Sequence, residues 1–191
     1  MMRQRTSLLA LNYLLLPLLA VSGVSADEHE DHAHGEAQEH ISELPKMGVA
    51  VILPTVGNET AGTLRLMQEG KNLKVVGEIF NLSPGEHGFH IHEFGDLRDL
   101  KTGKSVGGHF NPAGVDHGAP GKGHVGDLGN VTADDQGIAQ VDATLKNTQL
   151  HFVLGRTFVV HAGKDDLQSQ PSGDAGPRIG LGLIGIGNPE M

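Results

Sequence analysis

A pair of histidines near the middle of the chain has the spacing that metal ligands have on a β-strand. His90 and His92 flank Ile91, and residues i and i+2 of a strand project from the same face. Two neutral imidazoles on one face supply half of the ligand set that a copper or zinc ion needs. The pair alone is weak support for a site, because an exposed strand face also carries such histidines without a metal.

Four further side chains with metal-binding chemistry follow within 19 residues, in a stretch rich in glycine. They are His109, His117, His124 and Asp127. Three imidazoles and one carboxylate form a closed tetrahedral set, which is typical of structural zinc because no position is left open for water. A single histidine in a surface loop is ordinary, but four ligands in one such loop favour a zinc site.

A later histidine completes a second ligand set. His161 ends a predicted strand, and Asp165 lies four residues beyond it. All-nitrogen sets suit copper, and here such a set would comprise His90, His92, His109 and His161. His109 would then serve both metals, a sharing that the spacing of the residues does not show.

Two histidines are expected to have no metal-binding role. His87 follows the turn signal at Ser83–Gly85, and we expect a turn or surface residue there. His151 precedes an apolar pair near the start of an expected strand, where a structural role is commoner than ligation.

The composition excludes several classes of protein. The 191-residue chain has no cysteine, so disulfides, thiolate zinc sites, iron–sulfur clusters and cysteine nucleophiles are all ruled out. Its formal net charge of −9 provides no basic field for the phosphates of a nucleic acid. The 28 glycines are about twice the ordinary share of roughly 7%, which favours a loop-rich protein made mostly of strands.

The N-terminal part is predicted to be an exported leader followed by a tail. Residues 1–26 carry two arginines, a 14-residue apolar run and a small-x-small cleavage pattern, which together indicate a signal peptide. The run is shorter than the ~18 residues of a membrane-spanning helix, so we expect no membrane anchor. Export to the periplasm or the extracellular space follows, and losing Arg3 and Arg5 changes the net charge from −9 to −11.

Residues 27–46 read as a disordered acidic tail, because they hold seven acids and few apolar side chains. Histidine-rich tracts of this kind also bind copper or zinc ions. The tail is therefore either a solvated spacer or an accessory metal site, whose ligands would be His29, His32, His34 and His40.

The elements that must position the ligands belong to one all-β domain, residues 47–191. Short apolar–polar alternations separated by turn residues predict an antiparallel sandwich or barrel. The expected strands are residues 49–53, 63–67, 73–80, 88–93, 138–145, 157–161 and 179–186. Two glycine-rich stretches, 95–129 and 163–178, lack a strand pattern, and long loops on a compact β-scaffold are usually functional.

These residues together resemble the copper/zinc superoxide dismutase family over nearly all of residues 47–191. The motifs that carry the resemblance are Gly88-Phe-His-Ile-His-Glu-Phe-Gly-Asp96, Gly108-His-Phe-Asn-Pro112, His124-Val-Gly-Asp-Leu-Gly-Asn130, Gly155-Arg-Thr-Phe-Val-Val-His161, Gly176-Pro-Arg178 and Gly182-Leu-Ile-Gly185. The resemblance implies a Greek-key β-sandwich and an enzyme that converts superoxide to dioxygen and hydrogen peroxide.

The resemblance also implies roles for individual residues. Copper would be held by His90, His92, His109 and His161, and zinc by His109, His117, His124 and Asp127. His109 would bridge the metals and supply a proton to peroxide. Arg178 would guide the superoxide anion, and Asp165 would accept hydrogen bonds from His90 and His117. Lys164 is either a further steering charge or an ordinary solvated lysine.

One departure from the family concerns a disulfide that usually anchors the loop after the His-x-His strand. Residues 97–106 contain no cysteine, and Leu181 stands where the partner cysteine is expected, so packing or metal binding must replace the ~2–4 kcal/mol that such a bond typically contributes. The resemblance is compatible with a homodimer, although the motifs do not carry its interface. The histidine-rich tail motivates an alternative function, copper buffering or metal delivery on a dismutase scaffold.

Overall fold

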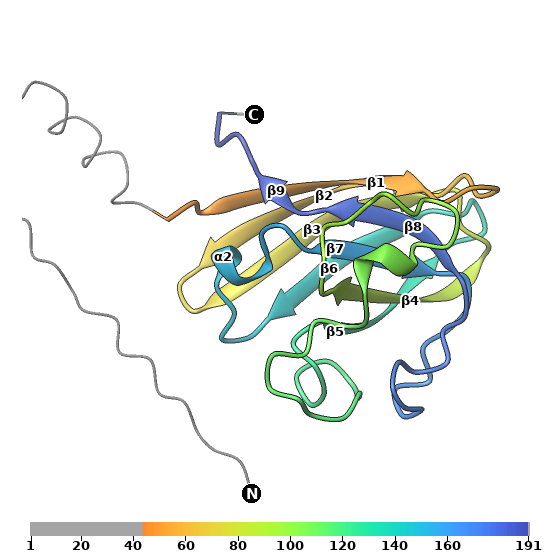
Figure 1. Cartoon of the computed structure of the whole chain (residues 1–191). Coiled ribbons are helices and arrows are strands. Elements are labelled where there is room, and N and C mark those ends of the chain that lie inside the picture. The colour runs from red at the N-terminus through yellow and green to blue at the C-terminus, as the bar shows by residue number, and fades with distance from the viewer. Residues whose placement is uncertain (1–43, 191) are drawn as a thin grey trace, which may run out of the picture. The chain divides into compact units, whose positions relative to one another are not determined.

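The computed structural model describes residues 44–190, whose strands form an antiparallel barrel (Figure 1). The strands are β1 (Met47–Pro54), β2 (Ala61–Glu69), β3 (Asn72–Phe80), β4 (Gly85–His92), β5 (Asp127–Ala133), β6 (Ala139–Leu145), β7 (Thr157–His161), β8 (Arg178–Leu183) and β9 (Gly185–Ile186). The helices are a 3₁₀ turn, η1 (Lys104–Val106), and a single α-helical turn, α2 (Leu150–Val153). No helix in this part of the chain is long and apolar enough to cross a membrane.

The sheet closes on itself because β1 pairs on both of its edges. The strand order is β2-β3-β6-β5-β4-β7-β8-β1-β9, with an additional pairing of β1 to β2. β1 pairs with β2 from Met47↔Met67 to Ile52↔Gly62, and its other edge reaches β8 at Leu53↔Leu181. Eight strands therefore enclose one interior, and closure leaves few free strand edges.

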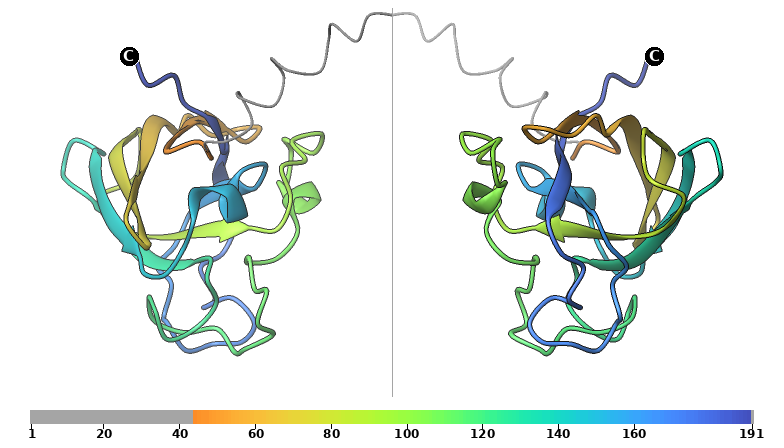
Figure 2. Two further views of the ribbon diagram at one scale, coloured as in Figure 1. Left: turned by 90° about the vertical axis from the view of Figure 1, so that its left-hand side faces the viewer. Right: turned by 90° about the vertical axis from the view of Figure 1, so that its right-hand side faces the viewer.

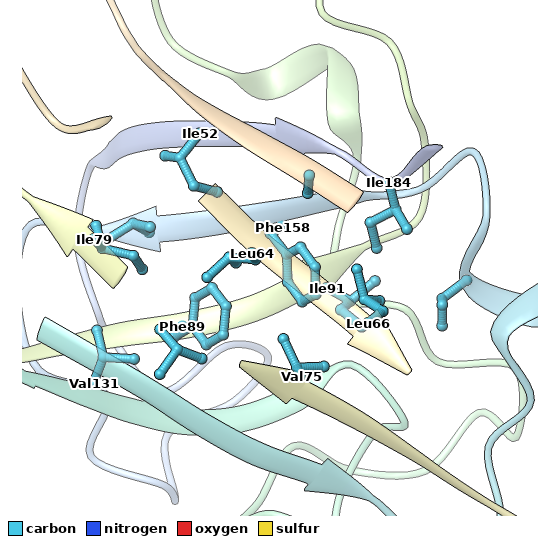
Figure 3. Packing of buried hydrophobic residues seen from close by; sticks show 14 of the residues in the cluster. Ile52, Leu64, Leu66, Val75, Ile79, Phe89, Ile91, Val131, Phe158 and Ile184 are labelled. Carbon is cyan, nitrogen blue, oxygen red and sulfur yellow. The ribbon is translucent and has the colours of Figure 1, made fainter. Parts of the chain in front are cut away.

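The interior of the barrel is filled by large apolar side chains from facing strands (Figure 3). Phe89 of β4 and Phe158 of β7 stack with ring centroids 5.1 Å apart, and both are almost completely buried. Burying a side chain of this size stabilises a fold by about 1.5–3 kcal/mol. The strands that carry the histidines are thus fixed by the core on their inner side.

The all-β architecture predicted from the sequence is confirmed, and the turns at Gly57, Gly70 and Gly137 have the positive φ angles that glycine allows. The expected strand at 179–186 is divided into β8 and β9. Two predictions were wrong: residues 127–129 begin β5 instead of ending a loop, and residues 150–153 form a helical turn where a strand start was expected.

β5 was missed because its buried positions hold residues that do not read as a core. Asp127, Gly129, Val131 and Ala133 alternate as the buried set, and the first two of these are not apolar side chains. A strand whose buried positions begin with an aspartate and a glycine lacks the apolar–polar alternation that predicts a strand.

Two long loops leave the barrel on the same side (Figure 2). One runs through residues 109–126, between the His92↔His109 bridge and β5, and the other through residues 162–177, between β7 and β8. They touch at His117, whose backbone N–H donates to Gln170 Oε1 at 2.9 Å. The predicted signal peptide and the four tail histidines lie in residues 1–43, outside the described residues.

Candidate metal centre

β4 separates its histidines from its apolar side chains by strand alternation. Phe89 and Ile91 belong to the barrel core, whereas His90 and His92 project from the opposite face, where the loops bury them to 0% and 1% exposure. The register His90↔Val159 and Ile91↔Phe158 fixes β4 against β7. The sequence pattern and the packing of the strand therefore agree.

Four imidazoles from three parts of the chain converge on one point. Their ligand atoms all lie within 4.8 Å of one another, and the four residues are His90, His92, His109 and His161. In each ring one nitrogen is buried without any hydrogen-bond partner, namely His90 Nδ1, His92 Nε2, His109 Nε2 and His161 Nε2. Buried polar atoms are rarely left unpaired. Four unpaired ring nitrogens in one cluster therefore indicate a metal-binding site.

The second nitrogen of these rings is held by an oxygen acceptor. His92 Nδ1 donates to the carbonyl of Gly107 at 2.9 Å, and His161 Nδ1 donates to the carbonyl of Gly176 at 2.9 Å. A fixed N–H on one side of an imidazole leaves the lone pair on the other side, facing the cluster. The surroundings thus select the tautomer that ligates a metal.

Burial keeps three of these imidazoles, those of His90, His92 and His161, neutral. It lowers the pKa of His90 to about 4, although the hydrogen bond that His90 donates to Asp165 raises it, and it lowers the pKa of His161 to about 3. The pKa of His92 is also well below its ordinary value, through burial and then through the charge of Arg178. Neutral imidazoles have free lone pairs at pH 7, as metal binding requires.

A second ligand set gathers around the Asp127 carboxylate. His109 Nδ1 lies 2.8 Å from Asp127 Oδ1, and His124 Nδ1 lies 3.1 Å from the same atom. His117 Nδ1 lies 3.1 Å from Oδ2. Ligands bound at ~2.0 Å around tetrahedral zinc are separated by ~3.3 Å, so the four side chains need little movement to hold such an ion.

The Asp127 carboxylate is held in its charged form. Burial raises its pKa, but hydrogen bonds from His109 and from the backbone N–H groups of Gly118 and His124 outweigh burial, and the pKa lies well below its usual range. The two N–H groups donate to Oδ2 at 3.1 and 2.8 Å. A charged carboxylate among three imidazoles matches the chemistry of a zinc ligand set.

Asp165 connects the two sets. Its Oδ2 accepts from His90 Nε2 at 2.8 Å, and its Oδ1 accepts from His117 Nε2 at 3.0 Å. These are the two histidines that the resemblance assigned to it. The carboxylate is completely buried, and it leaves the Nδ1 atom of each ring facing its own cluster.

Two amide side chains hold Asp165 and His117 in place. Neither amide was assigned a role from the sequence. Asn130 of β5 accepts from the Asp165 backbone N–H at 2.7 Å and donates to the Asp165 carbonyl at 2.9 Å. Gln170 makes the same pair of bonds to the backbone of His117, at 2.9 and 3.0 Å. No sequence signal singles out these amides, because their partners are backbone groups far away in the chain.

Arg178 lies beside the first set of histidines. Its Nη2 donates to the carbonyl of Gly107 at 2.7 Å, and its Nη1 donates to the carbonyl of Gly103. Burial lowers its pKa, while the charge of Asp99 raises it. Its positive charge in turn lowers the pKa of His92 and of His161. The guanidinium therefore raises the electrostatic potential at the four-histidine set.

The prediction that His87 is a turn or surface residue was wrong. The side chain is 2% exposed within β4, and its Nδ1 donates to the carbonyl of His161 at 2.8 Å. It lies inside the fold because β4 and β7 are paired antiparallel, which places the end of β7 beside the start of β4. His151 is exposed on α2 and belongs to neither ligand set.

Comparison with known proteins agrees with this geometry. The family model for copper/zinc superoxide dismutase (SODC) matches residues 60–184. The chain belongs to the copper/zinc superoxide dismutase family. Members of this family use copper and zinc, and in this dismutase-family chain the two histidine sets are the residues that could hold them.

Individual relatives of this dismutase-family chain cover most of its β domain. "Superoxide dismutase [Cu-Zn] 2" of Mesembryanthemum crystallinum is 42% identical over 156 residues, which are 73% of this chain and 97% of the relative. The crystal structure of the clock protein EA4 is similar with a TM-score of 0.65 and 37% identity, and the match covers 74% of this chain and 95% of that one.

Proposed function

We propose that this chain catalyses the dismutation of superoxide to dioxygen and hydrogen peroxide. The observation that carries the proposal is the pair of adjoining ligand sets that share His109, with Arg178 acting on the first of them. Copper held by the four-histidine set would supply a one-electron couple, so that one superoxide loses an electron and a second gains one with two protons. Zinc held by the second set would contribute charge and a fixed geometry.

We propose that the His109 ring bridges the two sets and delivers one of these protons. Its Nε2 lies in the four-histidine set, and its Nδ1 lies beside Asp127 in the other. An imidazole whose two nitrogens serve two sites can hold a proton at Nε2 whenever that nitrogen is free, and pass it to peroxide formed next to it. Asp127, which stays charged, supports Nδ1 during this exchange.

Arg178 is proposed to attract the substrate anion. The whole chain carries a formal charge of −9, so only a local positive field can favour superoxide near the histidines. Arg178 is half-buried, and its guanidinium is aimed by two carbonyls. A copper buffer would not need such a cation beside its ligands, which favours the enzyme over the copper-buffering alternative.

The test uses purified protein loaded with copper and zinc. Pulse radiolysis should show rapid dismutation that falls as salt is added, because steering by charge is screened. Arg178→Gln is expected to reduce the rate constant about tenfold and to weaken its salt dependence. The control is Arg98→Gln, which removes an exposed arginine paired with Asp96. Metal-loaded wild-type protein without activity would contradict the proposed function.

Export and an accessory metal site in the tail are proposals as well, supported by the sequence of residues 1–43. Mass spectrometry of the protein taken from its native cells should give a chain that begins at Asp27, whereas a retained Met1 would exclude cleavage. Deleting residues 27–40 should leave dismutation at saturating copper nearly unchanged, since the two described ligand sets lie elsewhere. A loss of activity would instead give the tail a catalytic role.

We further propose that a second copy of the chain covers an apolar surface formed by β1, β8, β9 and the start of loop 93–108. Its side chains are exposed by 42% to 68% and comprise Val51, Leu53, Phe94, Leu183 and Ile186. They are continuous, because β1 pairs with β8 and β9 and Gly95 lies against Leu183. Clustered apolar surface of this kind favours self-association.

Light scattering should therefore report a dimer for the wild-type protein and a monomer for Ile186→Asp. Val115→Asp, in the loop 109–126, is the matched control, since Val115 is also exposed, by 44%, and lies outside the surface. A wild-type monomer at micromolar concentration would overturn this proposal.

A further inference from the structure

The loop 93–108, which follows β4, is attached to the barrel by a small apolar cluster separate from the main core. Val106, Val159 and Leu181 are completely buried there, and Leu97 packs against them. Val159 and Leu181 are register partners on β7 and β8, so the barrel presents two fixed side chains. Val106 and Leu97 come from the loop, and their burial holds the loop against this pair.

This loop supplies the carbonyls that aim Arg178. Gly103 and Gly107 accept from the two ends of its guanidinium. The Gly107 carbonyl also accepts from Nδ1 of His92, a member of the four-histidine set. Movement of the loop would therefore displace a cation and loosen a ligand at the same time.

Leu181 lies next to Gly103, the residue whose carbonyl accepts a hydrogen bond from Arg178 Nη1. A Cβ atom at Gly103 would lie 3.1 Å from Arg178 Cδ and 3.2 Å from Leu181 Cδ2. Gly103 also has φ +68, a conformation that side chains other than glycine rarely adopt. The stem of the arginine and the leucine side chain thus both lie close to the side of Gly103 on which a Cβ atom would project.

We propose that Leu181 and Val106 are positioning residues for Arg178, and that their apolar contact fixes the loop in a chain that has no cysteine to do so. The contact acts through the Gly103 and Gly107 carbonyls. The positioning of Arg178 by these residues does not depend on the activity of the protein. Its importance for turnover rests on the proposed dismutation.

The experiment labels metal-free protein with phenylglyoxal, which modifies arginine, and follows each arginine by peptide mass spectrometry. Leu181→Ala is expected to speed the modification of Arg178 about tenfold, because the cavity it leaves lets the loop open locally. The rate at Arg65, which is exposed on β2 and lies outside the loop 93–108, should not change. Leu181→Ile, which keeps the volume, should restore slow labelling.

Val75→Ala is the matched control. Val75 is also completely buried but belongs to the main core, so its truncation destabilises the barrel without touching the loop. Equal acceleration at Arg178 in Val75→Ala and Leu181→Ala, or none in Leu181→Ala, would overturn the proposal.

A second variant tests the same proposal if Leu181→Ala does not fold. Val106→Ala makes a smaller cavity on the loop side, and hydrogen exchange of the loop amides replaces labelling as the readout. Faster exchange at Phe94, whose N–H donates to the Val106 carbonyl at 3.0 Å, supports the proposal, and unchanged exchange contradicts it. If the metal-loaded wild-type protein does not dismutate superoxide but its Arg178 is still labelled slowly, the proposed function is refuted. The positioning of Arg178 by the apolar cluster would still be supported.

Discussion

Asp165 contacts one histidine of each ligand set, so its replacement tests both sets. Asp165→Asn keeps the size of the side chain but replaces one oxygen acceptor by an NH₂ group, which cannot accept from His90 or His117. Loss of such an outer contact typically lowers metal affinity about 10- to 100-fold. Competition with a chelator should show weaker binding of copper, of zinc, or of both.

The neighbouring Asp166→Asn is the control for this substitution. Asp166 is exposed and accepts from Ser169 within its own loop, so its loss should leave the affinities unchanged. If Asp165→Asn binds both metals as tightly as the wild type, the carboxylate only fills space.

The lowered pKa values of His90 and His161 predict how the metal-free protein responds to acid. Both groups are neutral when folded, with pKa values of about 4 and about 3, whereas unfolded histidine titrates near ~6.5. Between these values the unfolded state binds more protons, so stability is fully present above pH ~6.5 and falls as the pH is lowered. Each histidine contributes up to ~1.4 kcal/mol per pH unit.

Urea unfolding of metal-free protein at several pH values between 7.5 and 4.5 measures this slope. His90→Gln should be less sensitive to pH than the wild type, because it removes one of the groups that must gain a proton. His151→Gln, at an exposed position, should have the wild-type slope. Stability that is independent of pH over this range would mean that the buried imidazoles are already charged or solvated.

At the scale of elements, β5 holds the loop 162–177 in place through Asn130. Asn130→Ala removes both bonds to the Asp165 backbone and leaves a buried N–H and carbonyl without partners, each at a cost of about 1–3 kcal/mol. Zinc affinity is expected to fall, because Asp165 then orients His117 less firmly. Thr132→Ala, at an exposed position on the same strand, is the control, and equal zinc affinity in the two variants would contradict this role.

The elements also show what a sequence can and cannot predict. β4 and β7 were predictable because large apolar residues such as Phe89 and Phe158 alternate with other residues. β5 was not, because the buried positions of this strand begin with Asp127 and Gly129 instead of with apolar side chains. His90, His92 and Arg178 could be found from residue type and motif, whereas Asn130 could not, since its amide acts on backbone groups that only the fold brings near.

At the scale of the whole molecule, metal removal should loosen the structure well beyond the site. Within residues 44–190, five buried imidazole nitrogens lack hydrogen-bond partners, and ions that bind only the folded state add their binding energy to its stability. Treatment with EDTA is expected to lower the melting temperature by about 10 °C or more. Differential scanning calorimetry before and after adding back each metal would apportion the loss, and an unchanged melting temperature would show that the sites contribute nothing to folding.

The apolar attachment of the loop 93–108 has a consequence for how the protein matures. A loop fastened by a disulfide reaches its final form only where thiols are oxidised, and a reductant can release it. Here the attachment is made by Val106, Val159 and Leu181, and the chain contains no thiol. Attachment of this loop by apolar side chains therefore requires no disulfide bond, and so neither an oxidant of thiols nor a disulfide isomerase.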